Sequence, residues 1–425
     1  MRFYLSVAWR NLFRQSRRTV ITAAALAVGA AACMGMWAWV DGMMGQMFDL
    51  MVTQQLGHVQ VHHPDYPTSR SLYDSLGGAR DGLARIESLP DTSAATGRLV
   101  TYGLVGTHQM SVGARLVGVE PAHEDAVTGI SGRIDAGRWL ATGDARAGVA
   151  IPAVLGRDLA KKLEVGVGDD IVMITQAADG SMANELLAIV GIAATGNAAM
   201  DRAGVYTPLA EIQQVLALED QVHEIVVLGK DPKATVELRR AVAGALGQAM
   251  PNPEGTSGGI LVRTWAETDP VTSRMMGLTD GMMVVLLVVV LAATGSGVLN
   301  TMLMAVFERT RELGLLKALG LKPRQVVALI LTEAALLGLL AATAGFVLGL
   351  AADAYVVFHG IDLAVSEGKG FEYEGVRFNP VIHGAFGWTG VGVTLATVIA
   401  VCLLASLWPA VRASRLRPVD AMRKA

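Results

Sequence analysis

The chain has 425 residues, of which 52% are hydrophobic and only 17% are charged. Soluble domains carry about 25% charged residues, so this composition is typical of a membrane protein. The formal net charge of −3 is small and argues neither for a nucleic-acid partner nor for an acidic one, so we expect no nucleic acid. Both cysteines, Cys33 and Cys402, lie inside apolar runs, so we expect no disulfide framework in a soluble part.

The chain begins with a basic stretch. Residues 1–18 contain five arginines and no acidic residue. Leu5, Trp9, Leu12 and Phe13 share one side at helical spacing, and arginines occupy the other. This pattern predicts a cytoplasmic amphipathic helix that lies on the inner membrane surface among the lipids. The alternative is a basic stretch that only sets the topology.

Four apolar runs are each long enough to cross a bilayer. They predict a membrane α-helical fold class, with four transmembrane helices and a large α+β periplasmic domain of two lobes between helices 1 and 2. The predicted spans are residues 19–40, 281–306, 326–352 and 387–411. The segments between and after them are the domain at 41–280, a loop at 307–325, a short outer loop at 353–386 and a tail at 412–425.

The orientation follows from the lysines and arginines near the span ends. Segments 1–18, 307–325 and 412–425 are rich in basic residues, whereas 353–386 is mainly acidic. The sequence therefore predicts a multi-pass membrane protein with both termini in the cytoplasm. In a bacterial inner (cell) membrane, segments 41–280 and 353–386 would then be periplasmic.

The region 41–280 is α+β by pattern. Alternating residues predict strands at 59–61, 115–119, 170–175, 186–192 and 224–228. Helices are predicted at 81–89, 152–163, 208–218 and 234–249, with Pro152 and Pro208 in their first turns. We expect two lobes, one built from 41–89 plus 208–264 and the other inserted between these pieces.

The segment 308–324 is the strongest functional candidate. It is a short, charged, helix-prone stretch between two apolar runs, and Pro323 separates it from the next helix. A helix that a partner binds needs a surface suited to contact. This segment carries both charge signs, an apolar stripe that includes Leu316, and glycines that allow close backbone approach. The candidate residues are Glu308, Arg309, Arg311, Glu312, Leu313, Gly314, Lys317 and Gly320. The alternative is a basic loop without a partner.

Two polar residues fall inside predicted spans. Asn300 lies in the second span, and Glu333 lies about two turns into the third. An ionisable group at this depth usually faces a partner or water. Glu333 could pair with Asn300 or with a basic residue near the inner surface, or could simply sit at interface depth.

Small residues four apart predict close helix packing, either within the chain or against another subunit. They are Ala25 and Gly29 in the first span, and Gly345 and Gly349 in the third.

Four residues near the start of the outer region suggest metal binding but lack a further strong ligand at a recognisable spacing. They are His58, His62, His63 and Asp65. We expect a solvated strand face and no metal there. No Gly-x-Ser-x-Gly elbow or pair of catalytic carboxylates stands out. The sequence therefore predicts no catalytic residues and a non-enzymatic subunit.

Several motifs together resemble the FtsX-like permeases of the MacB and lipoprotein-releasing (Lol) type ABC transporters, over the full length of the chain. They are AWRNL at 8–12, GHVQV at 57–61, ERTRELG at 308–314, KALG at 317–320, Glu333-Ala334, WPAVRAS at 408–414 and RPVDAMR at 417–423.

The resemblance implies an ATP-driven machine in which two permeases, copies or paralogues, sit above a cytoplasmic ATPase dimer. The segment 307–325 would be the coupling helix that lies in a cleft of the ATPase and transmits its motion to the outer domains. Lol-type members lift a lipoprotein from the inner membrane and pass it to a periplasmic carrier. The sequence contains no GxxxxGK[ST] loop, so we expect ATP and Mg to be bound by a separate ATPase, with no cofactor in this chain.

The layout favours a Lol-type permease that extracts lipoproteins. One alternative is a MacB-type mechanotransmission exporter with a split ATPase and an adaptor, which expels peptides, toxins or lipids. Another is an FtsX-like regulator of a cell-wall hydrolase, although that outer domain is usually smaller. The last alternative is a membrane-anchored enzyme or sensor that works without an ATPase.

Overall fold

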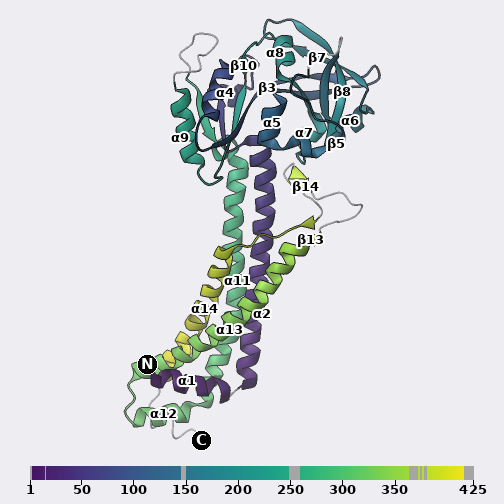
Figure 1. The fold of residues 1–425 in the computed structure, drawn as a ribbon. Coiled ribbons are helices and arrows are strands. Elements are labelled where there is room, and N and C mark those ends of the chain that lie inside the picture. The colour runs from purple at the N-terminus through teal and green to yellow at the C-terminus, as the bar shows by residue number, and fades with distance from the viewer. Residues whose placement is uncertain are drawn as a thin grey trace. The chain divides into compact units, whose positions relative to one another are not determined.

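The computed structural model describes residues 2–14, 16–144, 150–247, 259–362, 372–373, 376–377 and 381–415. The chain divides into two compact units (Figure 1). We call residues 1–45, 275–363 and 381–425 the membrane unit. Residues 46–274, grouped with 364–380, form the second unit, which we call the α+β domain.

The membrane unit is built from helices. They are α1 (Arg2–Arg14), α2 (Ser16–Phe48), α11 (Pro270–Glu308), α12 (Thr310–Ala318), α13 (Pro323–His359) and α14 (Trp388–Ser414). Within the described residues, four of them, α2, α11, α13 and α14, are long and apolar enough to cross a membrane. The first three predicted spans lie inside α2, α11 and α13, and the fourth, 387–411, begins one residue before α14. These three helices extend beyond the predicted spans at both ends, because helical backbone hydrogen bonding continues past the apolar runs. A short antiparallel pair, β13 (Ile361–Asp362) and β16 (Val381–Ile382), joins α13 to α14.

Small residues bring the spanning helices into contact within the chain. A Cβ added at Gly345 would lie 2.9 Å from the Cβ of Ala30, and one at Gly349 would lie 2.5 Å from the Met34 sulfur. Gly29 of α2 faces Thr294 of α11, where the corresponding distance is 3.3 Å. The sequence left open whether these glycines pack within the chain or against another subunit. The contacts among the described residues are within the chain.

The α+β domain alternates helices and strands. Its helices are η1 (Asp49–Leu56, a π-helix), α3 (Tyr66–Ser69), α4 (Ala79–Glu87), α5 (Pro121–Thr128), η2 (Ile130–Arg133, a 3₁₀-helix), α6 (Arg157–Leu163), α7 (Ala198–Ala203), α8 (Leu209–Val215), α9 (Thr235–Leu246) and α10 (Trp265–Thr268). Its strands are β1 (Val59–His62), β2 (Leu76–Gly77), β3 (Thr92–Gly106), β4 (Ser111–Val119), β5 (Ile134–Gly137), β6 (Ala150–Gly156), β7 (Asp170–Gln176), β8 (Met182–Ala193), β9 (Gly204–Pro208), β10 (Gln221–Val222), β11 (Glu224–Gly229) and β12 (Leu261–Thr264). A further hairpin, β14 (Glu372–Tyr373) with β15 (Val376–Arg377), belongs to the segment grouped with this domain.

One network of hydrogen-bonded strands runs through the α+β domain. Among the described residues it has ten strands in the order β12-β1-β11-β3-β4-β9-β6-β8-β5, with β7 pairing β3 and β8. The pairs β4–β9 and β6–β8 are parallel, and the remaining described pairs are antiparallel.

Two lobes can be distinguished by their apolar cores. The first lobe surrounds a cluster from β1, β11, α4 and α9, which includes Ile86 and Ile225. The second surrounds a cluster from β4, β6, β7, β8 and α8, which includes Leu116 and Ile151. α4 and α9 lie at one end of the domain, and α6 and α8 lie toward the other (Figure 1). The long strand β3 contributes to both clusters, with Ala95 in the first and Leu99 in the second.

Two predicted helix starts are wrong. Pro152 lies in strand β6, and the helix begins only at Arg157. Pro208 ends strand β9, and α8 begins one residue later. In the strand registers each proline has a partner on one side only, Pro152 on β8 and Pro208 on β4. The missing N–H is tolerated at such positions, so proline statistics at helix starts misled the interpretation. The five predicted strands are all present, as β1, β4, β7, β8 and β11, but the other strands of the domain, among them β3, β6 and β9, were not predicted.

Candidate functional site

The segment between the second and third spanning helices folds as a separate short helix. α11 ends at Glu308, Arg309 links the two helices, and α12 runs from Thr310 to Ala318. The expected coupling helix at 307–325 is therefore shorter than the charged stretch. α1 and α12 lie at the same end of the membrane unit (Figure 1).

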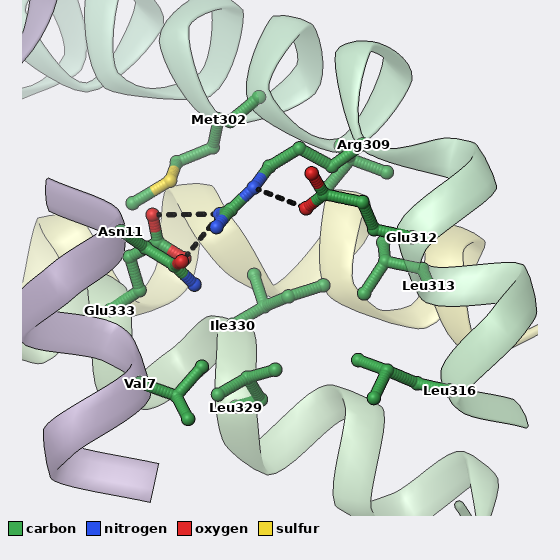
Figure 2. A pocket seen from close by; sticks show the side chains of 12 residues that line it. Val7, Asn11, Met302, Arg309, Glu312, Leu313, Leu316, Leu329, Ile330 and Glu333 are labelled. Atoms are coloured by element: carbon green, nitrogen blue, oxygen red, sulfur yellow. Dashed lines mark hydrogen bonds and ion pairs between the residues drawn. The ribbon is translucent and has the colours of Figure 1, made fainter. Parts of the chain in front are cut away.

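Arg309 ties this segment to the third spanning helix. Its Nη1 lies 3.3 Å from both carboxylate oxygens of Glu333, and its Nε lies 3.5 Å from Glu312 (Figure 2). The side chains of Arg309 and Glu333 are 18% and 13% exposed, so the pair is largely shielded from solvent. Asn11 of α1 points toward the same carboxylate. Of the partners left open for Glu333, the structure selects the basic residue, whereas Asn300 is exposed on α11.

Further polar contacts join α12 and the end of α11 to the neighbouring helices. Arg14 of α1 lies 2.8 Å from Glu312 of α12, and Arg18 of α2 lies 3.5 Å from Glu308, the last residue of α11. Lys317 Nζ donates a 2.8 Å hydrogen bond to the carbonyl of Ser414 at the end of α14. A cation near the C-terminus of a helix is also favourable for the helix dipole.

The inner face of α12 is apolar. Leu313 is buried in a cluster with Val306, Val326, Ile330 and Ala410, which come from α11, α13 and α14. A cavity of about 80 Å³ lies beside this cluster, and the side chains that line it converge from α1, α11, α12 and α13 (Figure 2). Leu313 therefore holds α12 to its own chain, although the sequence placed it on the stripe for a partner.

The outer face of α12 carries two leucines that the sequence interpretation did not select, beside Arg311, which it did select. Leu315 and Leu319 are 54% and 78% exposed, and Arg311 is exposed on the same side. Positions 311, 315 and 319 recur every four residues and so share one helix face. Once the packing shows that Leu313 faces inward, the same helical spacing places these two leucines on the opposite face.

Gly320 has a conformational role. Its φ of +101° lies in the region that favours glycine. The N–H of Gly320 bonds to the Lys317 carbonyl and that of Leu321 to the Leu316 carbonyl, both at 3.0 Å, which is the Schellman ending of a helix. Pro323 begins α13, as predicted. Gly314 is buried on the inner face of α12.

The histidines near the start of the α+β domain are not on a solvated face. His58 and His62 are each 2% exposed, which corrects the expectation. His62 stacks on Tyr66, and Tyr66 stacks on His223, at centroid distances of 5.6 and 5.0 Å. Burial lowers the pKa of His58, His62 and His223 below the ordinary value of 6.5.

A different trio provides the third ligand that the sequence lacked. Ligand atoms of His63, Asp65 and Asp74 lie within 4.8 Å of one another. His63 Nδ1, however, already accepts a hydrogen bond from the backbone N–H of Asp65 at 3.3 Å. We assign no metal role to it.

Comparison with protein families matches both parts of the chain. The model of the MacB-like periplasmic core domain matches residues 19–245, which is more than half of the chain. The model of the FtsX-like permease C-terminal region matches residues 284–418, the part that contains α12.

Individual relatives cover the chain to different extents. The lipoprotein-releasing system transmembrane protein LolC of Neisseria meningitidis is 22% identical over 99% of this chain and 97% of its own length. LolE of Haemophilus influenzae is 24% identical over 72% of this chain and 71% of its own length. The macrolide export ATP-binding/permease protein MacB of Nitrosomonas europaea is 33% identical over 38% of this chain and 20% of its own length. With four apolar helices and both family matches in place, the chain belongs to the MacB-like periplasmic core domain family with an FtsX-like permease C-terminal region, and it is an ABC transporter permease of the LolC/LolE or MacB type.

Proposed function

We propose that this chain is the permease of a machine that extracts lipoproteins from the inner membrane, and that α12 is where a cytoplasmic ATPase dimer grips it. Both termini would lie in the cytoplasm and the α+β domain in the periplasm. A second permease, a copy or a paralogue, would complete the complex, and a periplasmic carrier would receive the lipoprotein.

The observation that carries the proposal is the two-faced character of α12. Its inner face is fixed to α1, α11, α13 and α14 through ion pairs, a helix-end hydrogen bond and Leu313. Its outer face presents Leu315 and Leu319 to solvent. Exposed leucines beside charged residues favour a protein partner, and the inner contacts would pass any displacement of α12 to the spanning helices.

ATP and Mg would be bound outside this sequence. The 425 residues contain no GxxxxGK[ST] loop to hold the phosphates. The chain would then contribute no hydrolytic residue and act as a non-catalytic subunit.

Lipoprotein as the cargo is supported by the relatives. The lipoprotein-releasing LolC protein aligns over almost all of both chains. A MacB-type exporter is the second candidate, because a MacB protein reaches a higher identity, 33%, over its shorter aligned region.

The test is to copurify the chain with its ATPase and to measure binding and lipoprotein release from proteoliposomes. We expect the double variant L315D/L319D to weaken ATPase binding roughly tenfold or more, because two carboxylates would be buried against the partner. The matched variant L315M/L319M keeps an apolar face of similar volume and should bind normally.

Equal binding by L315D/L319D would contradict the role of α12. Normal binding and ATP hydrolysis without lipoprotein release to a carrier, but with export of a peptide, would favour the MacB-type function instead.

A further inference from the structure

The π-helix η1 is the point at which the first spanning helix continues into the α+β domain. It follows α2 directly along the chain and covers Asp49–Leu56. The N–H of Gly57 bonds to the carbonyl of Val52 at 2.6 Å, with the five-residue spacing of a π-helix. A π-helix of eight residues is unusual, since most are single turns at functional sites.

One arginine caps the end of η1. Nη1 of Arg98, on β3, donates a 2.7 Å hydrogen bond to the carbonyl of Gln55. This carbonyl lies in the last turn of η1, where carbonyls lack partners within the helix. A cation there is favoured by the helix dipole. The Gln55 side chain is held separately, because its Oε1 accepts a 2.5 Å hydrogen bond from Nδ2 of Asn197.

Arg98 is itself held rigidly. Its Nε and Nη2 form a two-pronged contact with Glu124 of α5 at 2.9 and 2.7 Å. Nη1 also lies 3.4 Å from Glu224, its cross-strand partner on β11. The side chains of Arg98 and Glu124 are 6% and 1% exposed. Burial by itself lowers the pKa of Arg98, but the two carboxylates outweigh burial and raise it.

The surroundings of the end of η1 are polar and loosely packed. Cavities of about 30 and 20 Å³ flank Gln55, and their lining includes Arg133, Arg115 and Tyr206. Voids of this size each have room for about one water. Tight apolar packing therefore does not fix the end of η1 on this side, and the directed bonds from Arg98 and Asn197 matter correspondingly more.

Arg98 stands at the junction of the two lobes. It lies on β3 between Ala95 of the first core and Leu99 of the second. The preceding residue, Gly97, faces the opposite side of the sheet, where a Cβ would lie 3.2 Å from Val222. Gly97 and Val222 line a cleft of about 340 Å³, whose walls are α4 of the first lobe and α8 of the second.

We propose that Arg98 is the positioning residue that fastens η1 to the junction of the lobes, so that movement of the first spanning helix changes the width of the cleft between α4 and α8. This inference rests on the proposed function, because the ATPase supplies the movement. The chain passes from α2 into η1 without a break, so a displacement or rotation of α2 is applied to the Gln55 carbonyl. Arg98 then delivers it to α5 through its two-pronged contact with Glu124.

The experiment uses the full chain assembled with its ATPase in lipid. Spin labels on A84C and A210C, in a C33A/C402A background, report the distance across the cleft from exposed positions on α4 and α8. If the complex contains two copies of the chain, labels on different copies also give distances. Complexes that carry only A84C or only A210C identify these distances. The distance distribution is measured without nucleotide and after trapping with ATP and vanadate.

In the unmodified complex we expect trapping with ATP and vanadate to shift the distribution of distances across the cleft. In R98K the resting distribution should be unchanged, but the shifted fraction should fall roughly fivefold or more, the lower end of typical coupling between sites. Lysine keeps the charge but cannot bind Glu124 with two prongs and reach Gln55 at once. N197D retains the cap of α7 yet loses the Nδ2 donor to Gln55, and it should give a smaller loss.

E224Q is the matched control. It perturbs the same buried network and the partner of Arg115, but it leaves both hydrogen bonds to η1, so the shift should persist. A full shift in both R98K and N197D, or an equal loss in E224Q, would overturn the inference. If the unmodified complex shows neither ATP-driven release nor a shift, the proposed function fails instead, so the two failures are distinguishable.

Discussion

At the residue scale, the chain places several charged groups where solvent does not reach them. Arg309 with Glu333, and Arg98 with Glu124, are both largely buried pairs. Such a pair adds little net stability compared with apolar residues, but removing one partner strands the other charge. We therefore interpret both pairs as devices that fix one element against another.

The first prediction concerns Arg309 and Glu333. Each single variant, R309Q or E333Q, should lower the thermal unfolding midpoint of the full chain in detergent, because one buried charge loses its partner. The double variant should lose less than the sum, with an interaction free energy of about 0.5–3 kcal/mol. R324Q is the control, since Arg324 is exposed at the start of α13 and an exposed charge should contribute little. Strict additivity of the two changes would show that the pair is not coupled.

A second prediction concerns pH. Because burial lowers the pKa of His58, His62 and His223, the unfolded chain binds protons that the folded chain does not. Stability is therefore present above about pH 6.5 and is lost as the pH falls below it, by at most about 1.4 kcal/mol per pH unit for each histidine. Thermal unfolding between pH 7.5 and 5 measures this loss.

His108 provides the matched comparison, because it is exposed in the same domain. H108Q should leave the slope of stability against pH unchanged, whereas H62Q should reduce it. A slope that is identical in H62Q and in the unmodified chain would contradict the assignment.

At the scale of elements, the surface that α12 presents to a partner depends on the position of its C-terminal end as much as on its charged residues. The Schellman ending at Gly320 sets the turn that leads into Pro323 and α13. The outward leucines lie in or next to this last turn, so its geometry decides how they are presented.

We expect G320A to strain this turn by about 1–2 kcal/mol, because an alanine at positive φ brings its Cβ against the backbone. Affinity for the ATPase should fall, while the thermal stability of the α+β domain should not. G320N should be milder, since asparagine tolerates this conformation better. G244A, in the middle of α9 with open space around it, is a control that should have no effect on binding. Normal binding by G320A would mean that the turn does not control the leucines.

At the scale of the whole molecule, the topology is a prediction that labelling can test. In a C33A/C402A background, M182C and L319C place a thiol at residues that are 70% and 78% exposed. A membrane-impermeant maleimide should label M182C in intact spheroplasts and L319C only after lysis. Labelling of L319C without lysis would reverse the orientation.

The sequence by itself determined the membrane character of the chain. Runs of about 20 apolar residues can satisfy their backbone hydrogen bonds in lipid only as helices, so the four spans follow from composition alone. Motifs in 308–324 likewise marked α12 as the functional candidate. Alternation identified strands such as β7, in which every second residue is buried.

Tertiary structure alone decided which residues face which partner. β6 and β9 have almost every residue buried, so period-two alternation is absent, and their prolines suggested helices. Leu313 and Leu315 are two positions apart and chemically identical, yet only the packing of α11, α13 and α14 turns one inward and leaves the other exposed. Arg98 meets Gln55, Glu124 and Glu224 across long sequence separations. Local patterns carry no information about such contacts, because they exist only after the sheet has brought distant strands together.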